Sequence, residues 1–138
     1  NHKSSEAIRY NLLGLLFQKK GDYTKSTESY KEAIPLFTKS NDIRYLSNTL
    51  INIGKNQLNT GDYKDAEENI KLGLNNAKII KSKENISLGY NALVSYYTEV
   101  KDYKKAYYES VRNAFDDIIA LNVMQKEIVG MDVTTTLD

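Results

Sequence analysis

The sequence predicts an all-α chain of stacked helical hairpins, and three observations lead to that prediction. Gly-Asp-Tyr occurs at residues 21–23 and again at 61–63, and Lys-Asp-Tyr follows at 101–103. A motif typical of a turn between two helices, which we call a corner, therefore recurs every 40 residues. A fixed period of this size is typical of a solenoid in which each unit covers its neighbour's apolar face. The 138 residues include one proline, and apolar side chains recur at helical rather than alternating spacing. These features favour one helical body over a sandwich of short strands.

Six helices are expected in order along the chain. Gly21 ends the first, because glycine readily adopts the left-handed conformation found at helix ends, and Asp22 caps the second. Pro35 lies inside the second helix and predicts a kink or an early stop there. Ser82 caps the fifth helix. The helices are expected at about residues 5–20, 23–39, 43–59, 63–80, 84–100 and 103–121.

The third corner and the tail depart from this pattern. Lys101 stands where the first two corners have glycine, and a left-handed lysine costs about 1 kcal/mol. Residues 122–138 are expected to form a C-terminal extension that is helical through about Ile128. Gly130 and the β-branched run at 133–136 lower the helix propensity, so the end is expected to fray. The chain begins with Asn rather than Met, so we expect a fragment of a longer protein.

The composition argues against several kinds of partner. A net charge of +1 with 27% charged residues gives no electrostatic reason to expect nucleic acid or an anionic membrane. No stretch reaches the roughly 18 apolar residues of a membrane helix, so membrane contact by this segment is not expected. The absence of cysteine excludes disulfides and thiol chemistry. One cluster of basic and aromatic residues could contact RNA, although the balanced charge favours a solvated face: Lys101, Tyr103, Lys104, Lys105, Tyr107 and Tyr108.

No catalytic constellation is present in the sequence. His2 is the single histidine, and there is no glycine-rich phosphate loop, zinc-binding His-Glu-x-x-His motif or Ser-His pair. The adjacent carboxylates at 67–68 and 116–117 would point about 100° apart on a helix, which suits a solvated surface better than acid–base catalysis. The sequence therefore predicts no enzyme activity, no metal site and no cofactor.

The residues around the corners resemble the tetratricopeptide repeat (TPR) family. Its pattern is aromatic-x-x-Leu-Gly-x-x-aromatic on a first helix and Ala-x-x-x-aromatic on a second. The corresponding residues are Tyr10, Leu13, Gly14, Phe17, Ser26, Tyr30 and Ala33; then Leu50, Ile53, Gly54, Gln57, Ala66, Ile70 and Gly73; then Tyr90, Leu93, Val94, Tyr97, Ala106, Ser110 and Asn113. Small residues such as Gly14, Gly54, Ala66 and Ala106 would let paired helices approach closely. Val94 and Ser110 depart from the pattern and predict looser packing in the third hairpin.

This resemblance implies a right-handed superhelix of three helix-turn-helix hairpins, at about residues 5–42, 43–82 and 83–121, followed by the extension. It also implies a non-catalytic module that binds a protein or peptide in a concave groove. The 40-residue period is similar to a longer-helix subgroup of the family, and residues 104–108 and 116–119 resemble the last repeat of Bacteroidetes-type regulators. The implied function is the sensor or interaction region of a bacterial histidine kinase or transcriptional regulator, in the cytoplasm or on the periplasmic side of a membrane-anchored sensor.

The expected ligand-binding residues lie on the first helices of the second and third hairpins. Spacings of four and three place the polar residues of the third helix on one face, which the repeat register turns toward the groove. Carboxamides both donate and accept hydrogen bonds, so they can hold a peptide backbone whatever its side chains. The alternative is that these are ordinary solvated positions, because asparagine is frequent in the chain. The candidates are Asn48, Asn52, Lys55 and Asn59, followed on the fifth helix by Asn91 and Ser95, with Glu99 continuing the polar lining.

The first helix carries aliphatic residues, Ile8, Leu12 and Leu15, at the matching positions. Burying each such side chain stabilises by roughly 1.5–3 kcal/mol, so we expect cover from an upstream repeat, a second chain in a homodimer, or the tail folding back. Partial exposure at the end of a short array is the simpler alternative. A self-associating assembly scaffold that uses this face is therefore the second functional hypothesis.

Overall fold

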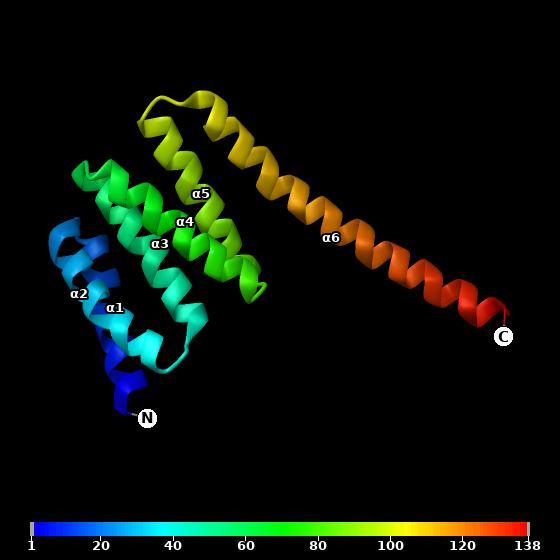
Figure 1. The fold of residues 1–138 in the computed structure, drawn as a ribbon, viewed down its shortest axis with the longest axis horizontal. Coiled ribbons are helices and arrows are strands. Elements are labelled where there is room, and N and C mark those ends of the chain that lie inside the picture. The colour runs from blue at the N-terminus through cyan, green and yellow to red at the C-terminus, as the bar shows by residue number, and fades with distance from the viewer. Residues whose placement is uncertain (1, 138) are drawn as a thin grey trace.

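The computed structural model describes the backbone of residues 2–137 and the side chains of residues 4–130. Within that part of the chain the structure is entirely helical, in the expected succession of hairpins (Figure 1). Helices adjacent in sequence pack against one another, and α3 also packs against α5. The elements are α1 (His2–Lys19), α2 (Tyr23–Lys39), α3 (Ile43–Thr60), α4 (Tyr63–Ile79), α5 (Lys83–Glu99) and α6 (Tyr103–Leu137). The predicted all-α superhelical stack is confirmed.

The glycine corners form as the sequence predicts. Gly21 and Gly61 adopt left-handed φ angles of 81° and 84°, which end α1 and α3. Asp22 then caps α2 by accepting a hydrogen bond from the backbone N–H of Lys25 at 3.1 Å. The corner thus reverses the chain within a few residues and sets the two helices of each hairpin side by side.

Residues other than glycine take the left-handed conformation at the remaining connections. Lys101 has a φ of 63°, as predicted for the third corner. Asn41 and Lys81, which join successive hairpins, have φ angles of 55° and 56°. The hydroxyl of Ser82 caps α5 by accepting from the N–H of Asn85 at 3.5 Å. Asparagine tolerates the left-handed region better than lysine does, so the two lysine positions carry backbone strain.

The close approach of paired helices depends on small residues. A Cβ added to Gly54 on α3 would lie 2.5 Å from Cγ1 of Ile70 and 2.9 Å from the backbone oxygen of Ala66 on α4. A Cβ on Gly14 would lie 2.5 Å from the ring of Tyr30. The sequence pattern therefore reports a real steric requirement of the hairpins.

Two apolar clusters hold the described part of the chain together. The smaller lies between the first hairpin and the start of the second, around Ala7, Ala33 and Phe37. The larger is formed by buried residues of α3 to α6, namely Ile51, Ala66, Ile70, Leu74, Tyr90, Ala92, Leu93, Tyr96, Tyr97 and Ala106. The core therefore covers the junctions between hairpins as well as their interiors.

Helix α2 has the expected bounds, Tyr23–Lys39, and continues through Pro35, so the early stop that was one of the two predicted effects of the proline does not occur. Proline removes one backbone hydrogen bond of the helix. The side chain of Pro35 is exposed, and the flanking Ala33 and Phe37 are both fully buried against α1 and α3. Tertiary packing on each side of the proline thus outweighs the local loss.

The predicted C-terminal helical extension is present as a direct continuation of α6, and it is longer than expected, because the helix does not end near Ile128. Helix α6 is continuous from Tyr103 to Leu137 and passes through Gly130. One glycine in a helix interior costs only about 1 kcal/mol, which does not end a helix that is otherwise intact.

The third hairpin is more loosely packed than the first two, as Val94 and Ser110 predict, and Ala106 is the sole buried residue on the described part of α6. In the described chain no helix has both the length and the apolar character needed to cross a membrane.

Candidate functional site

A cleft of about 640 Å³ lies between α3 and α5, on the face that the first helices of the hairpins share. Its polar lining consists mainly of Lys55 and Asn59 from α3 with Asn91, Ser95 and Glu99 from α5. Residues at spacings of three, four and seven share one helix face, and the packing of α3 against α5 sets the two polar faces beside each other. We refer to this hollow as the α3–α5 cleft.

Most polar side chains of the α3–α5 cleft form no ion pair or side-chain hydrogen bond with other described residues. Within the described residues, Lys55 and Glu99 form no ion pair, and the exposed Asn91 and Ser95 make no side-chain hydrogen bond. Asn59 donates from Nδ2 to the backbone oxygen of Lys55 at 3.0 Å, which leaves its carbonyl oxygen as an acceptor. The cleft therefore offers one cation, one carboxylate, and hydrogen-bond donors and acceptors.

Four of the six predicted groove residues, Lys55, Asn59, Asn91 and Ser95, line this cleft, whereas Asn48 and Asn52 do not. The structure uses the latter two in an internal chain of amides. Asn52 donates to Oδ1 of Asn48 at 3.0 Å, and Asn48 donates to Oδ1 of Asn85 at 3.4 Å. Asn85 in turn donates to the backbone oxygen of Arg44 at 3.0 Å. These amides join α3 to the start of α5.

The apolar part of the cleft was not predicted. Leu58, Tyr63 and Leu88 contribute to its lining. Leu88 could have been found from its spacing, because it precedes Asn91 by three and Ser95 by seven residues on one face of α5. Tyr63 gives no such signal, because it begins α4 and reaches the cleft through the reversal at Gly61.

The apolar face of α1 is only partly as expected. Leu12 and Leu15 are 57% and 38% exposed, so these two interface candidates are accessible. Ile8 is half-buried and packs against the cluster of Ala7, Ala33 and Phe37. It belongs to the core rather than to an open surface.

The acidic pairs noted in the sequence take part in ordinary structural contacts. Asp116 accepts a hydrogen bond from the hydroxyl of Tyr90 at 2.8 Å, and the half-buried Glu67 forms an ion pair with the exposed Lys71 at 3.6 Å. In the part of the chain that the structure describes, no group of three or more His, Cys, Asp or Glu residues gathers in a way that could hold a metal. The side chain of His2 lies outside the described residues.

Comparison with known proteins gives the same fold. The TPR domain of FLU from Arabidopsis has a similar structure, with a TM-score of 0.75 at 22% sequence identity, over 88% of this chain and 98% of that domain. None of the curated protein sequences matches the chain. The sequence profile of the tetratricopeptide repeat matches residues 5–79, and this fold supports a non-catalytic protein-interaction module. Because that match covers more than half of its residues, the chain belongs to the tetratricopeptide repeat family.

Proposed function

We propose that the chain is an interaction module that binds an extended segment of a partner protein in the α3–α5 cleft. One observation carries the proposal: Lys55, Asn91 and Ser95 converge on the cleft without protein partners, beside apolar lining from Leu88. An extended peptide presents N–H and C=O groups that need partners once water is removed. The amide of Asn91 can donate to one of these groups and accept from another.

The charges of the cleft narrow the class of peptide. Lys55 on α3 and Glu99 on α5 have opposite signs and border the same hollow. A purely acidic segment would be attracted by Lys55 and repelled by Glu99, and a purely basic one would meet the reverse. The arrangement therefore favours a segment that is neutral or carries both signs over a chain-terminal carboxylate held by several cations.

The test is to select peptides from a random displayed library on the intact chain and to measure their affinity by calorimetry. Asn91→Ala and Lys55→Ala should each weaken binding by about tenfold, since each removes a partner of the ligand that contributes about 1–1.5 kcal/mol. Matched controls are Asn75→Ala on α4 and Lys31→Ala on α2, which are exposed and lie away from the cleft. Equal affinities for cleft and control variants would show that the ligand lies elsewhere.

We also propose the kind of larger protein to which this interaction module belongs. The 40-residue period and the residues at 104–108 and 116–119 support a sensor or interaction region of a bacterial histidine kinase or transcriptional regulator. Sequencing the complete reading frame tests this directly. A kinase or DNA-binding segment in the same frame would support the setting, and a frame without either would contradict it while leaving cleft binding intact.

The exposed leucines of α1 favour a second candidate, a scaffold that self-associates through this helix. Leu12 is 57% exposed, and Leu16 beside it is 49% exposed. Leu12→Glu should then convert an oligomer to a monomer in sedimentation velocity runs. Leu72→Glu is the matched control, because Leu72 on α4 is 51% exposed and lies on another surface. A chain whose association Leu12→Glu leaves unchanged does not use this face.

A further inference from the structure

Helix α6 carries an apolar stripe that the rest of the described chain does not cover. Seven of its positions follow one another at alternating intervals of four and three residues, the heptad spacing of a coiled-coil seam. We call them the α6 seam: Tyr107, Val111, Ala114, Ile118, Leu121, Gln125 and Ile128. The large apolar members are 44–72% exposed. The seam spans just over three heptads, or about 33 Å of helix.

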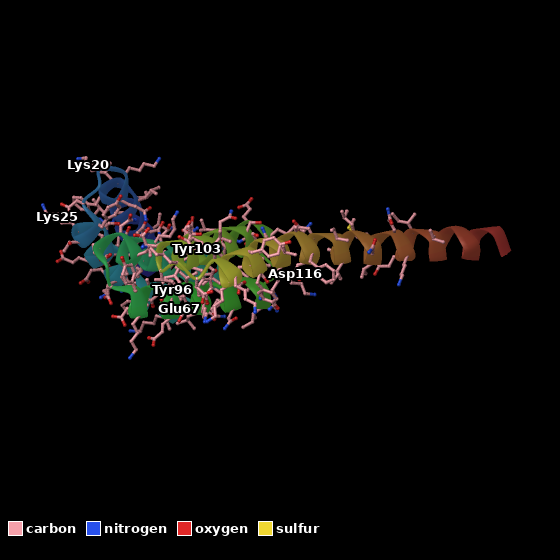
Figure 2. The ribbon with its side chains drawn as sticks, turned by 90° about the horizontal axis from the view of Figure 1, so that it is seen from above. Lys20, Lys25, Glu67, Tyr96, Tyr103 and Asp116 are labelled. Atoms are coloured by element: carbon pink, nitrogen blue, oxygen red, sulfur yellow. The ribbon has the colours of Figure 1, made fainter. Side chains whose placement is uncertain are left out.

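The repeat body lies on the other side of α6. Ala106 is buried against α5, Asn113 and Ala120 are half-buried, and Asp116 accepts from Tyr90 on α5. In the heptad frame set by the seam, these four residues occupy the c and f positions, which face outward in a coiled coil. Beyond this contact α6 runs away from the body as a lone helix (Figures 1 and 2). A helix pairing along the seam would therefore not collide with its own repeats.

The repeat register shows that the stripe is not the usual surface of a second helix. Forty residues upstream, Val111 corresponds to Lys71 and Phe115 to Asn75 on α4. Both α4 residues are exposed although α5 packs against α4, and Lys71 makes a surface ion pair with Glu67. A further hairpin stacked in the same register would thus leave Val111 and Phe115 in water. The occupant of the seam has to approach from a different direction.

The residue types along the seam fit a second copy of the same helix. Val111 and Ile118 are β-branched and occupy a positions, and Leu121 occupies a d position, a combination that favours two parallel strands. In such a pair Gln125 meets its own equivalent, and each amide can donate to and accept from the other. A polar residue at one a position also fixes the register.

Electrostatics does not oppose self-pairing. Among the flanking e and g positions between residues 107 and 128, Asp117 alone is charged. In a parallel, in-register pair it would face Asn122 of the second copy, so no like charges meet across the seam. We propose that α6 pairs with α6 of a second copy as a parallel, in-register coiled coil, which makes the protein a homodimer with its two repeat bodies on the outer sides.

The first test is sedimentation equilibrium of the intact chain over a range of concentrations. The wild type should show a reversible monomer–dimer equilibrium, and Ile118→Glu should weaken dimerisation by about a hundredfold, because it buries an unpaired carboxylate in each strand. Ile79→Glu is the matched control, since Ile79 on α4 is 75% exposed and off the seam. Far-UV circular dichroism verifies that both variants keep their helices.

The second test fixes the orientation of the helices. The chain has no cysteine, so Leu121→Cys introduces a single thiol at a d position and Lys126→Cys a single thiol at an outward b position. Under oxidation by O₂ with a copper–phenanthroline catalyst, the thiols of two Leu121→Cys chains should join as a disulfide in a parallel in-register dimer, whereas those of two Lys126→Cys chains should not. An antiparallel pair along the seam would separate the two Leu121→Cys thiols and give no crosslink at either position.

Each remaining outcome overturns the proposal in a recognisable way. A chain that stays monomeric at all concentrations has no α6 pairing, and a dimer that resists Ile118→Glu but is lost with Leu12→Glu uses α1. A dimer without a crosslink at position 121 excludes the parallel register. Peptide binding in the α3–α5 cleft is measured separately, so either proposal can fail alone.

Discussion

The side-chain amide of Asn56 on α3 donates a hydrogen bond to Oγ of Ser26 on α2 at 2.8 Å, and both residues are fully buried. The hydroxyl of Ser26 donates to the backbone oxygen of Gly14 on α1 at 2.6 Å. Gln18, also on α1, donates from Nε2 to Oδ1 of Asn56 at 2.8 Å. One asparagine therefore links both helices of the first hairpin to the second hairpin.

Replacing Asn56 by alanine should lower the free energy of unfolding by about 2–3 kcal/mol. The substitution leaves the Gln18 amide without its acceptor and opens a cavity beside Ser26. Urea denaturation followed by circular dichroism measures the change. Asn59→Ala on the same helix is the control, because Asn59 is exposed and its loss should change stability by less than about 0.5 kcal/mol. Similar losses in both variants would contradict a special role for the buried amide.

Gly54→Ala should destabilise the chain by about 1–3 kcal/mol through overpacking. The new Cβ would lie 2.9 Å from the backbone oxygen of Ala66, which cannot move without shifting α4. Gly130→Ala provides the contrast, because a Cβ there meets nothing within 4 Å and alanine has the higher helix propensity by about 1 kcal/mol. Thermal unfolding of both variants should therefore move in opposite directions, and a stable Gly54→Ala protein would show that the hairpin can open.

The helix boundaries of the first five helices agree with the sequence-based prediction to within three residues. They could be predicted because each depends on a local device: the left-handed Gly21 and Gly61, and the caps at Asp22 and Ser82. The length of α6 could not be predicted in this way. Helix propensity predicts that Gly130 destabilises the helix locally, but it does not show that a long helix tolerates this loss and continues.

The residues that line the α3–α5 cleft could be predicted only in part from helical spacing. Helical spacing groups the polar residues of α3 on one face, but it could not distinguish Lys55, which lines the cleft, from Asn52, which does not. That distinction depends on how α5 crosses α3. The crossing brings Oδ1 of Asn85 to 3.4 Å from Nδ2 of Asn48, so the amides of Asn48 and Asn52 form hydrogen bonds within the protein. Tyr63 enters the cleft through a different feature, the reversal of the chain at Gly61 after α3.

Lys101→Gly should raise the free energy of unfolding by about 0.5–1 kcal/mol. Lys101 has a φ of 63°, in a region that costs a residue with a Cβ about 1–2 kcal/mol, and part of that gain is offset by the greater entropy of glycine in the unfolded chain. Lys31→Gly should have the opposite effect, because Lys31 is exposed in the middle of α2 and glycine weakens helix interiors. Chemical denaturation of both variants checks the sign, and destabilisation by Lys101→Gly would mean that the lysine side chain contributes contacts of its own.

Tyr30 places an unpaired hydroxyl in the first hairpin. Its side chain is 1% exposed, and within the described residues its hydroxyl has no hydrogen-bond partner. Burial raises the pKa of Tyr30 from 10.0 to about 12, because the phenolate would lose its solvation. The folded state therefore keeps the proton at pH values where the unfolded state has released it.

The sign of the pH dependence follows from this raised pKa. Below pH 10 the free energy of unfolding does not depend on the ionisation of Tyr30. As the pH rises from 10 to about 12 it falls by about 2 kcal/mol, because the unfolded state releases the phenolic proton first. Tyr30→Phe removes both the titration and the unpaired hydroxyl, so it should raise stability at pH 7 by about 1 kcal/mol and flatten the alkaline decline. Tyr103→Phe, at a residue that is 63% exposed, is the control and should leave the stability at pH 7 and the alkaline decline unchanged.

Urea titrations at pH 7, 10 and 12 compare the wild type with the two variants. If the Tyr30→Phe variant lost stability as steeply as the wild type above pH 10, the alkaline decline would have to come from other groups, among them Tyr97, whose pKa burial and Glu67 also raise.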